Sequence, residues 1–199
     1  MLPLEVLDVP TATSPRRQHV TSEIGIGIGI GRTPVARAFL CVALLSFPAF
    51  ADEAADIRAL LARGDPAAAL ARADVALAAH PADVPLRFQR GVALMDLGRD
   101  AQALAHFERL CEEHPELPDP WNNIALLQVR AGRIEAARAA LDNALRADPA
   151  HRIARANLGL VHLMLAEAAW QRLVDSGPVD PALGHRLEAV RALLAGARP

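Results

Sequence analysis

The sequence predicts an all-α protein built as an array of helical hairpins, because small residues and prolines recur in it every 34 residues and the apolar residues between them follow helical spacing. Residues 131–149 show both features, with Ala137, Leu141 and Ala144 on one helical face. No comparable stretch alternates with the period of two that is typical of a strand. In such an array each unit buries its apolar face only by stacking on the next unit.

Each recurring residue type has a role in a helical hairpin. The glycines are expected to adopt the left-handed conformation that ends a first helix, and the alanines to lie where the paired helices approach most closely. The prolines are expected to end the second helix. Asp65-Pro66 and Asp119-Pro120 predict an N-cap followed by a first-turn proline. The recurring residues are Gly64, Gly98 and Gly132, then Ala69, Ala103 and Ala137, then Pro81, Pro115 and Pro149.

This pattern resembles the tetratricopeptide repeat family, which combines an aromatic residue, a Leu-Gly pair, a turn glycine, two alanines and a closing proline. Matching residues are Trp121, the Leu158-Gly159 pair, Gly91 and Phe107. Glu53 and Arg87 depart from the pattern at the aromatic position, and Leu110 departs from it at an alanine position. The resemblance implies a right-handed α-solenoid over 52–175, with units at about 50–83, 84–117 and 118–151 and a degenerate unit at 152–175.

The fourth unit has lost the turn between its two helices. Neither glycine nor proline occurs between its first-helix signature and Trp170, so 153–173 is expected to be one continuous helix. The stretch 176–199 is interpreted as a linker and a capping helix over 181–195, because terminal repeats need a cap to stay soluble. Its apolar stripe consists of Leu183, Leu187, Val190 and Leu194.

The N-terminal part of the chain predicts export. Residues 32–51 combine arginines, an apolar stretch and Ala49-Phe50-Ala51, which is typical of a signal peptide cleaved after Ala51 and indicates a periplasmic protein. An uncleaved membrane anchor would need roughly 20 apolar residues, and a lipoprotein site at Cys41 fits less well. Residues 1–31 are interpreted as a disordered, non-native or mis-assigned extension, with the true start downstream, Val35 being a candidate.

Composition excludes several classes of partner and site. The chain has 21 Lys plus Arg and 23 Asp plus Glu, a formal net charge of −2, which argues against a nucleic-acid partner. No membrane span is expected after signal cleavage. Cys111 would be the one cysteine left, so no intramolecular disulfide is expected, and its burial as a small hydrophobe is favoured over a reactive or intermolecular thiol.

The sequence offers no pattern for catalysis. Its histidines are scattered without metal-ligand spacing, and no G-x-S-x-G, P-loop or G-x-G-x-x-G motif is present. The acidic cluster of Glu112, Glu113 and Glu116 is typical of a solvated helix end. We therefore expect no enzyme activity, no metal and no cofactor.

The resemblance implies a binding surface instead, because in this family the first helices line a concave groove that takes a peptide or a helix. The family's carboxylate-binding activity is not transferred. Asn122 matches one of its positions, but Leu126 replaces a second asparagine and the chain has no lysine. The positions that map to the groove are Phe88, Val92, Met95, Asn122, Leu126, Val129, Arg130 and Leu160.

Three interpretations of this apolar groove stay open. It could recognise a segment of an envelope protein, it could be covered by the chain's own helix or by a second copy in a homo-oligomer, or its residues could be core. The first makes the protein an exported, non-catalytic interaction module or scaffold of the cell envelope. The stretch 114–127 also resembles small secreted proteobacterial tetratricopeptide proteins.

Overall fold

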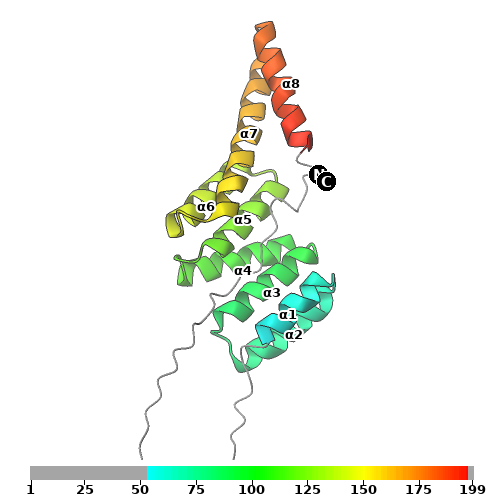
Figure 1. The fold of residues 1–199 in the computed structure, drawn as a ribbon, viewed down its shortest axis with the longest axis vertical. Coiled ribbons are helices and arrows are strands. Elements are labelled where there is room, and N and C mark those ends of the chain that lie inside the picture. Colours follow the sequence, from blue (N-terminus) through cyan, green and yellow to red (C-terminus); the bar gives the residue numbers. More distant parts are fainter. Residues whose placement is uncertain (1–52, 197–199) are drawn as a thin grey trace, which may run out of the picture. The chain divides into compact units, whose positions relative to one another are not determined.

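The computed structural model describes residues 53–196, and every regular element among them is a helix (Figure 1). The prediction of an all-α fold is confirmed. The predicted signal peptide at 32–51 and the predicted extension at 1–31 lie outside the described residues. Within 53–196 no helix is long and apolar enough to cross a membrane. The helices are α1 (Glu53–Ala62), α2 (Pro66–Ala79), α3 (Val84–Asp96), α4 (Asp100–Glu113), α5 (Pro118–Arg130), α6 (Ile134–Ala147), α7 (Arg152–Asp175) and α8 (Pro181–Gly196).

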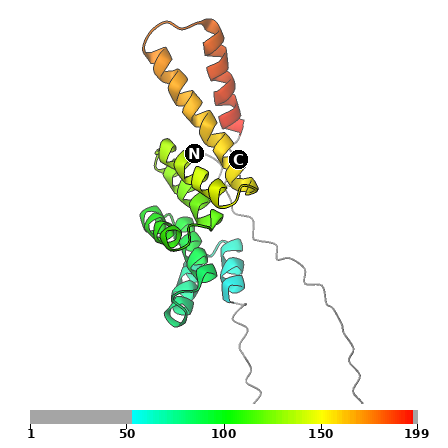
Figure 2. The same ribbon diagram turned by 90° about the vertical axis from the view of Figure 1, so that its left-hand side faces the viewer.

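Three helical hairpins stack in chain order. The helices α1 and α2, α3 and α4, and α5 and α6 pair within each hairpin, and the second helix of each hairpin packs on the helix that follows it (Figures 1 and 2). This arrangement is the predicted solenoid, in which the apolar face of each hairpin is covered by its neighbours.

The turn inside each hairpin has the same geometry in all three repeats. Gly64, Gly98 and Gly132 have φ angles of 74°, 68° and 71°, as predicted for left-handed turn residues. In each turn the amide after the glycine donates to a carbonyl five residues earlier, at 3.0, 2.9 and 2.8 Å. This is the Schellman arrangement, which satisfies carbonyls that the end of a helix leaves without partners.

Of the two N-caps predicted from the sequence, Asp65 and Asp119, one is present in the structure. The Asp65 carboxylate accepts from the amide of Ala68 at 3.0 Å and caps α2, as predicted. The same prediction for Asp119 is wrong, because α5 already begins at Pro118 and the Asp119 carboxylate accepts from Nε2 of His151 at 2.9 Å instead. His151 in turn caps α7, where its Nδ1 accepts from the amide of Ala154 at 3.1 Å.

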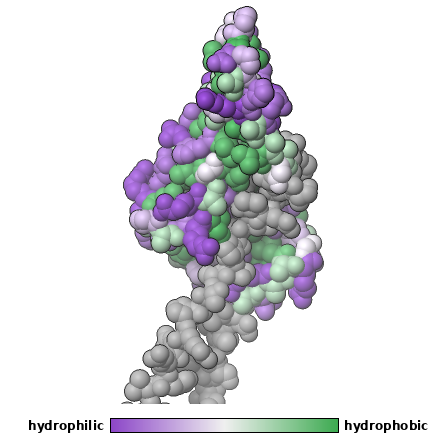
Figure 3. Space-filling model, turned by 45° about the horizontal axis from the view of Figure 1, so that its top comes forward, coloured by the Kyte–Doolittle hydropathy of each residue, from purple (hydrophilic) through white to green (hydrophobic). Residues whose placement is uncertain are grey.

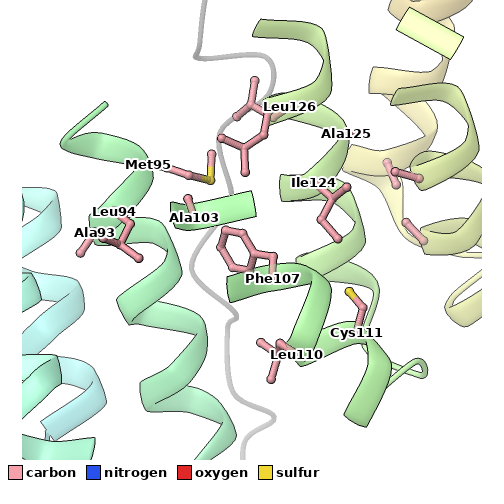
Figure 4. Close-up of a cluster of buried hydrophobic side chains, with 14 of the residues drawn as sticks. Ala93, Leu94, Met95, Ala103, Phe107, Leu110, Cys111, Ile124, Ala125 and Leu126 are labelled. Atoms are coloured by element: carbon pink, nitrogen blue, oxygen red, sulfur yellow. The ribbon is translucent and has the colours of Figure 1, made fainter. Parts of the chain in front are cut away.

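Close approach of the paired helices is visible at Gly91 of α3. A Cβ atom built there would lie 2.5 Å from two ring carbons of Phe107 on α4, a separation that carbon atoms do not tolerate. Phe107 is fully buried among the apolar side chains between α3, α4 and α5 (Figure 4). Ala103, at the predicted close contact, is also fully buried.

The fourth unit departs from the other three. Helix α7 runs without a turn for 24 residues, in agreement with the absence of a glycine or proline turn signal, and α8 returns along it (Figure 2). Leu187, Val190 and Leu194 of α8 are buried, and Arg191 of α8 contacts Glu167 and Gln171 of α7. The predicted capping helix is therefore present and packs on α7.

Glycine replacement separates close packing from helix propensity. We expect Gly91→Ala to lower the free energy of unfolding by about 1–2 kcal/mol, because overpacking against Phe107 costs more than the roughly 1 kcal/mol that alanine gains in a helix. The control is Gly159→Ala in α7, where an added Cβ meets nothing within 4 Å, so this variant should be stabilised. Urea unfolding followed by circular dichroism measures both, and a stabilised Gly91→Ala would contradict the close contact.

Candidate functional site

The candidate site is the surface formed by the first helices α3, α5 and α7, and the structure divides its eight predicted residues into three groups. Four apolar residues are half-buried, three are buried, and Arg130 makes polar contacts with the preceding repeat. The half-buried residues are Phe88, Val92, Val129 and Leu160. The buried residues are Met95, Asn122 and Leu126.

The half-buried residues are the part of the predicted groove that a partner could touch. Phe88, Val92 and Val129 pack against the core cluster and keep part of their surface exposed. The Phe88 ring lies 5.8 Å from the ring of Phe107 at a tilt of 52°, which fixes its orientation. Figure 3 shows hydrophobic side chains gathered at the base of the α7–α8 hairpin, beside strongly hydrophilic ones.

Met95 and Leu126 belong to the core rather than to an open surface. They are 6% and 4% exposed, and they approach each other from α3 and α5 (Figure 4). Both belong to the same buried cluster as Phe107. Their burial agrees with the interpretation of the sequence in which groove positions are core. A partner on this surface would therefore not contact Met95 or Leu126 directly.

Asn122 uses its side chain inside the protein. Its Oδ1 accepts from Nδ2 of Asn157 on α7 at 2.8 Å, and both side chains are buried. The hydrogen bond that offsets the low helix propensity of asparagine therefore goes to the next repeat. Sequence reasoning did not identify Asn157 as the partner of Asn122. The available signal was that Asn157 lies one 34-residue repeat after Asn123, on the next first helix.

Arg130 connects two repeats. From the end of α5 its guanidinium donates to the main-chain oxygen of Met95 at 3.4 Å and to the carboxylate of Asp100 at 3.1 Å. These groups lie at the end of α3 and the start of α4. The observed contacts of this predicted groove residue therefore hold neighbouring hairpins together.

Two different contacts occupy the aromatic position of the repeat. In the third repeat Trp121 donates its indole N–H to the carbonyl of Pro115 at 3.2 Å. In the second repeat Arg87 makes two hydrogen bonds, 2.5 and 2.9 Å long, to the carboxylate of Glu113 on α4. These hydrogen bonds from Arg87 lower the pKa of Glu113. The departure from the aromatic residue is thus compensated by an ion pair within the hairpin.

His106 joins α4 to α3 through a buried hydrogen bond. Its Nε2 lies 2.7 Å from the carbonyl oxygen of Arg87, so the ring N–H donates to that oxygen. Burial lowers the pKa of His106, and the positive charges of Arg90, Arg87 and Arg109 lower it further, although the hydrogen bond to the carbonyl acts in the opposite direction. The folded protein therefore holds this imidazole in its neutral form.

Cys111 is 2% exposed, and burial raises its pKa to about 12. The thiolate that nucleophilic or metal chemistry needs is therefore not formed at neutral pH. This agrees with the interpretation of Cys111 as a small buried hydrophobe. Among residues 53–196 there is no group of three or more His, Cys, Asp or Glu side chains that could hold a metal ion.

The chain was compared with known families and structures. A family model described as Tetratricopeptide repeat matches residues 43–118 and 122–181, which is more than half of the chain. The TPR domain of Sgt2 from Aspergillus fumigatus is 19% identical with a TM-score of 0.57, over 67% of this chain and 87% of that one. The first TPR domain of the human RPAP3 protein is 15% identical with a TM-score of 0.55, over 59% and 92%.

A third similar structure contains a ligand. The first TPR of Spaghetti (RPAP3) bound to the HSP90 peptide SRMEEVD is 15% identical with a TM-score of 0.53, and the match covers 59% of this chain and 93% of that one. At these identities the likeness shows the fold. All three structures contain the helical hairpin array that the described residues form.

Burial of His106 gives the protein a defined response to pH. The unfolded chain binds a proton at His106 near pH 6.5, whereas the folded chain binds it only at lower pH. The contribution of His106 to the free energy of unfolding should therefore be fully present above pH 6.5 and fall as the pH is lowered through this value. Urea midpoints between pH 7.5 and about 5.5 measure this fall, which should be smaller in His106→Gln. A control with the exposed His162 changed to Gln should keep the full fall.

Burial of Cys111 predicts a slow reaction with thiol reagents. With Cys41 replaced by serine, the native protein should react with an aromatic disulfide reagent far more slowly than the same protein in denaturant, because Cys111 lacks both access and thiolate. Absorbance at neutral pH follows the reaction. Equal rates in the two conditions would show that the thiol is accessible.

Proposed function

From the premise that the chain belongs to the tetratricopeptide repeat family, we propose that it is a non-catalytic protein-interaction module that binds a peptide or a helix on the surface of α3, α5 and α7. One observation carries the proposal. Apolar side chains of three consecutive first helices, Phe88, Val92, Val129 and Leu160, stay partly exposed, and the first three of them also pack against the core. Partly exposed apolar side chains on neighbouring helices are typical of surfaces that recognise an extended or amphipathic segment.

The partner is expected to be held by apolar contact rather than by its terminal carboxylate. The HSP90 peptide in the Spaghetti complex shows that a protein of this fold binds a peptide, which supports the class of partner. This chain has no lysine, and the groove residues Asn122 and Arg130 hydrogen-bond within the protein. A partner with spaced apolar side chains fits this surface better than an acidic chain end.

We further propose that the interaction takes place in the periplasm. The proposal rests on the signal-peptide pattern at 32–51, with cleavage after Ala51. In that compartment the module would act as a scaffold for a cell-envelope protein. N-terminal sequencing of the mature protein from its native cells tests the cleavage site, and a mature chain that keeps residues before 52 would contradict it.

Self-association is the second candidate function. Leu173 of α7 and Leu193 of α8 are 51% and 60% exposed, which gives the hairpin apolar surface that a second copy could cover. In the variant of this idea in which the chain covers its own groove, the covering element is the long helix of the fourth unit, α7, and α7 packs on α5.

A pair of aspartate substitutions distinguishes the two functions. We expect Val92→Asp with Val129→Asp to reduce capture of a heterologous partner by about tenfold or more, because a charge placed in an apolar interface is costly. The matched control is Val75→Asp on α2, where valine is 72% exposed and lies on a second helix. Capture is measured by crosslinking the tagged full chain in its native cells, followed by mass spectrometry.

Circular dichroism of each variant checks that the helices remain folded. Loss of capture in the folded double variant, with capture retained in Val75→Asp, supports the recognition function. Self-crosslinks alone, with a mass by light scattering that drops when Leu173 and Leu193 are changed to Asp, would favour self-association. Unfolding of the double variant would place Val92 and Val129 in the core, and Leu160→Asp on α7 then tests the surface.

A further inference from the structure

The second half of α7 is much less covered than the first half. The buried residues of α7 are Ala154, Asn157 and Val161, and no residue of this helix after Val161 is buried. From there α7 extends beyond the α5–α6 hairpin, with α8 beside it (Figures 1 and 2). A helix with one neighbour leaves its other sides in contact with water.

Two exposed leucines lie on the same side of the α7–α8 hairpin. Arg191 of α8 donates to the side chain of Gln171 on α7, so these two positions face each other across the hairpin. Two antiparallel helices are related by a local two-fold axis, so residues at equal offsets from a facing pair lie on the same side. Leu173 follows Gln171 by two residues, and Leu193 follows Arg191 by two residues. They are 51% and 60% exposed.

Each of these leucines has an exposed alanine one helical turn before it. Ala169 precedes Leu173 by four residues, and Ala189 precedes Leu193 by four residues. Each alanine therefore lies on the same face as its leucine, about 6 Å away along the helix axis. The two helices carry the same pattern of one large and one small apolar residue, which is the pattern that allows helices to interdigitate.

The two sides of the hairpin differ in charge. The side opposite to the leucines exposes Arg172 and Asp175 of α7 and Glu188 of α8. On the leucine side the nearest charged residue is Arg186, which lies toward the tip of the hairpin. Charged side chains are depleted at the core of protein interfaces and common at their rim. The leucine side is therefore the one that suits an apolar partner.

We propose that a second copy of this chain binds the leucine side of the α7–α8 hairpin, with the two hairpins antiparallel and related by a two-fold axis. The midpoint of each leucine–alanine pair is Gln171 on α7 and Arg191 on α8, and these residues contact each other, so one axis passes both midpoints. Each leucine then lies against the alanine of the same helix in the second copy. A two-fold interface needs such a self-complementary patch.

The position of the array favours antiparallel over parallel hairpins. The helices α5 and α6 lie at the base of the hairpin and widen the molecule there (Figure 1). Parallel hairpins would bring two arrays to the same end, where they would overlap, whereas antiparallel hairpins place the arrays at opposite ends. The dimer leaves α3 and α5 outside the interface and presents two recognition surfaces. This consequence rests on the proposed function, whereas the dimer itself is a property of the free protein.

Light scattering on the full chain tests the interface. The parent should give twice the mass of one chain and dissociate on dilution. Leu173→Asp with Leu193→Asp should give the mass of one chain at a concentration at which the parent is dimeric, because the interface would bury charges. The matched control is Ala168→Asp with Ala192→Asp, at exposed positions on the charged side, which should keep the double mass. If circular dichroism shows that the leucine variant does not fold, Ala169→Arg takes its place.

Disulfide trapping between copies tests the register. All chains carry Cys41→Ser, and Cys111 can stay because it is 2% exposed. A mixture of Ala169→Cys chains and Leu173→Cys chains should form a disulfide between copies, because antiparallel pairing places these positions opposite each other. A mixture of Ala169→Cys chains and Leu193→Cys chains, which parallel pairing would bring together, should give a several-fold lower yield. Mass spectrometry of the linked peptides measures both yields.

A parent chain with the mass of one chain at every concentration would overturn the proposal. A dimer that persists in the folded leucine variant would also overturn it, and a higher yield in the mixture of the 169 and 193 variants would overturn the antiparallel register. These measurements use no partner. A chain that dimerises in this way but captures no heterologous protein would contradict the proposed function and leave the dimer intact, and capture by a monomeric chain would do the reverse.

Discussion

The fold depends on how closely the two helices of a hairpin can approach each other. At Gly91 even a single added carbon would overlap the ring of Phe107, and Ala69, Ala103 and Ala137 are fully buried at the matching positions of the second helices. Only small residues allow this distance. Because the distance is short, each hairpin forms a compact layer whose apolar faces are then covered by the layers on either side.

Features set by local sterics could be predicted from the sequence. The turn glycines at 64, 98 and 132 have the positive φ that the period implied, and the cap of α2 at Asp65 and the unbroken helix α7 follow from single residue types. Each of these depends on a few neighbouring residues. Local chemistry was therefore sufficient to predict the helices and the order in which they stack.

Features set by long-range proximity could not be predicted in this way. The sequence near Asp119-Pro120 fits an N-cap, yet the carboxylate pairs with His151, which lies 32 residues further along the chain. The same holds for the candidate site, where Asn122 and Arg130 are engaged by Asn157 and Asp100. Helical periodicity places such residues on a face, but only the spacing of stacked hairpins decides which of them stay exposed.

The ion pair between Arg87 and Glu113 makes the repeats respond differently to ionic strength. Dissolved salt weakens the attraction of this pair, since Glu113 is exposed to solvent. The neutral hydrogen bond of Trp121 to Pro115 in the third repeat is not weakened in this way. Added salt therefore weakens the contact at this position of the second hairpin, whereas the contact at the same position of the third hairpin is retained.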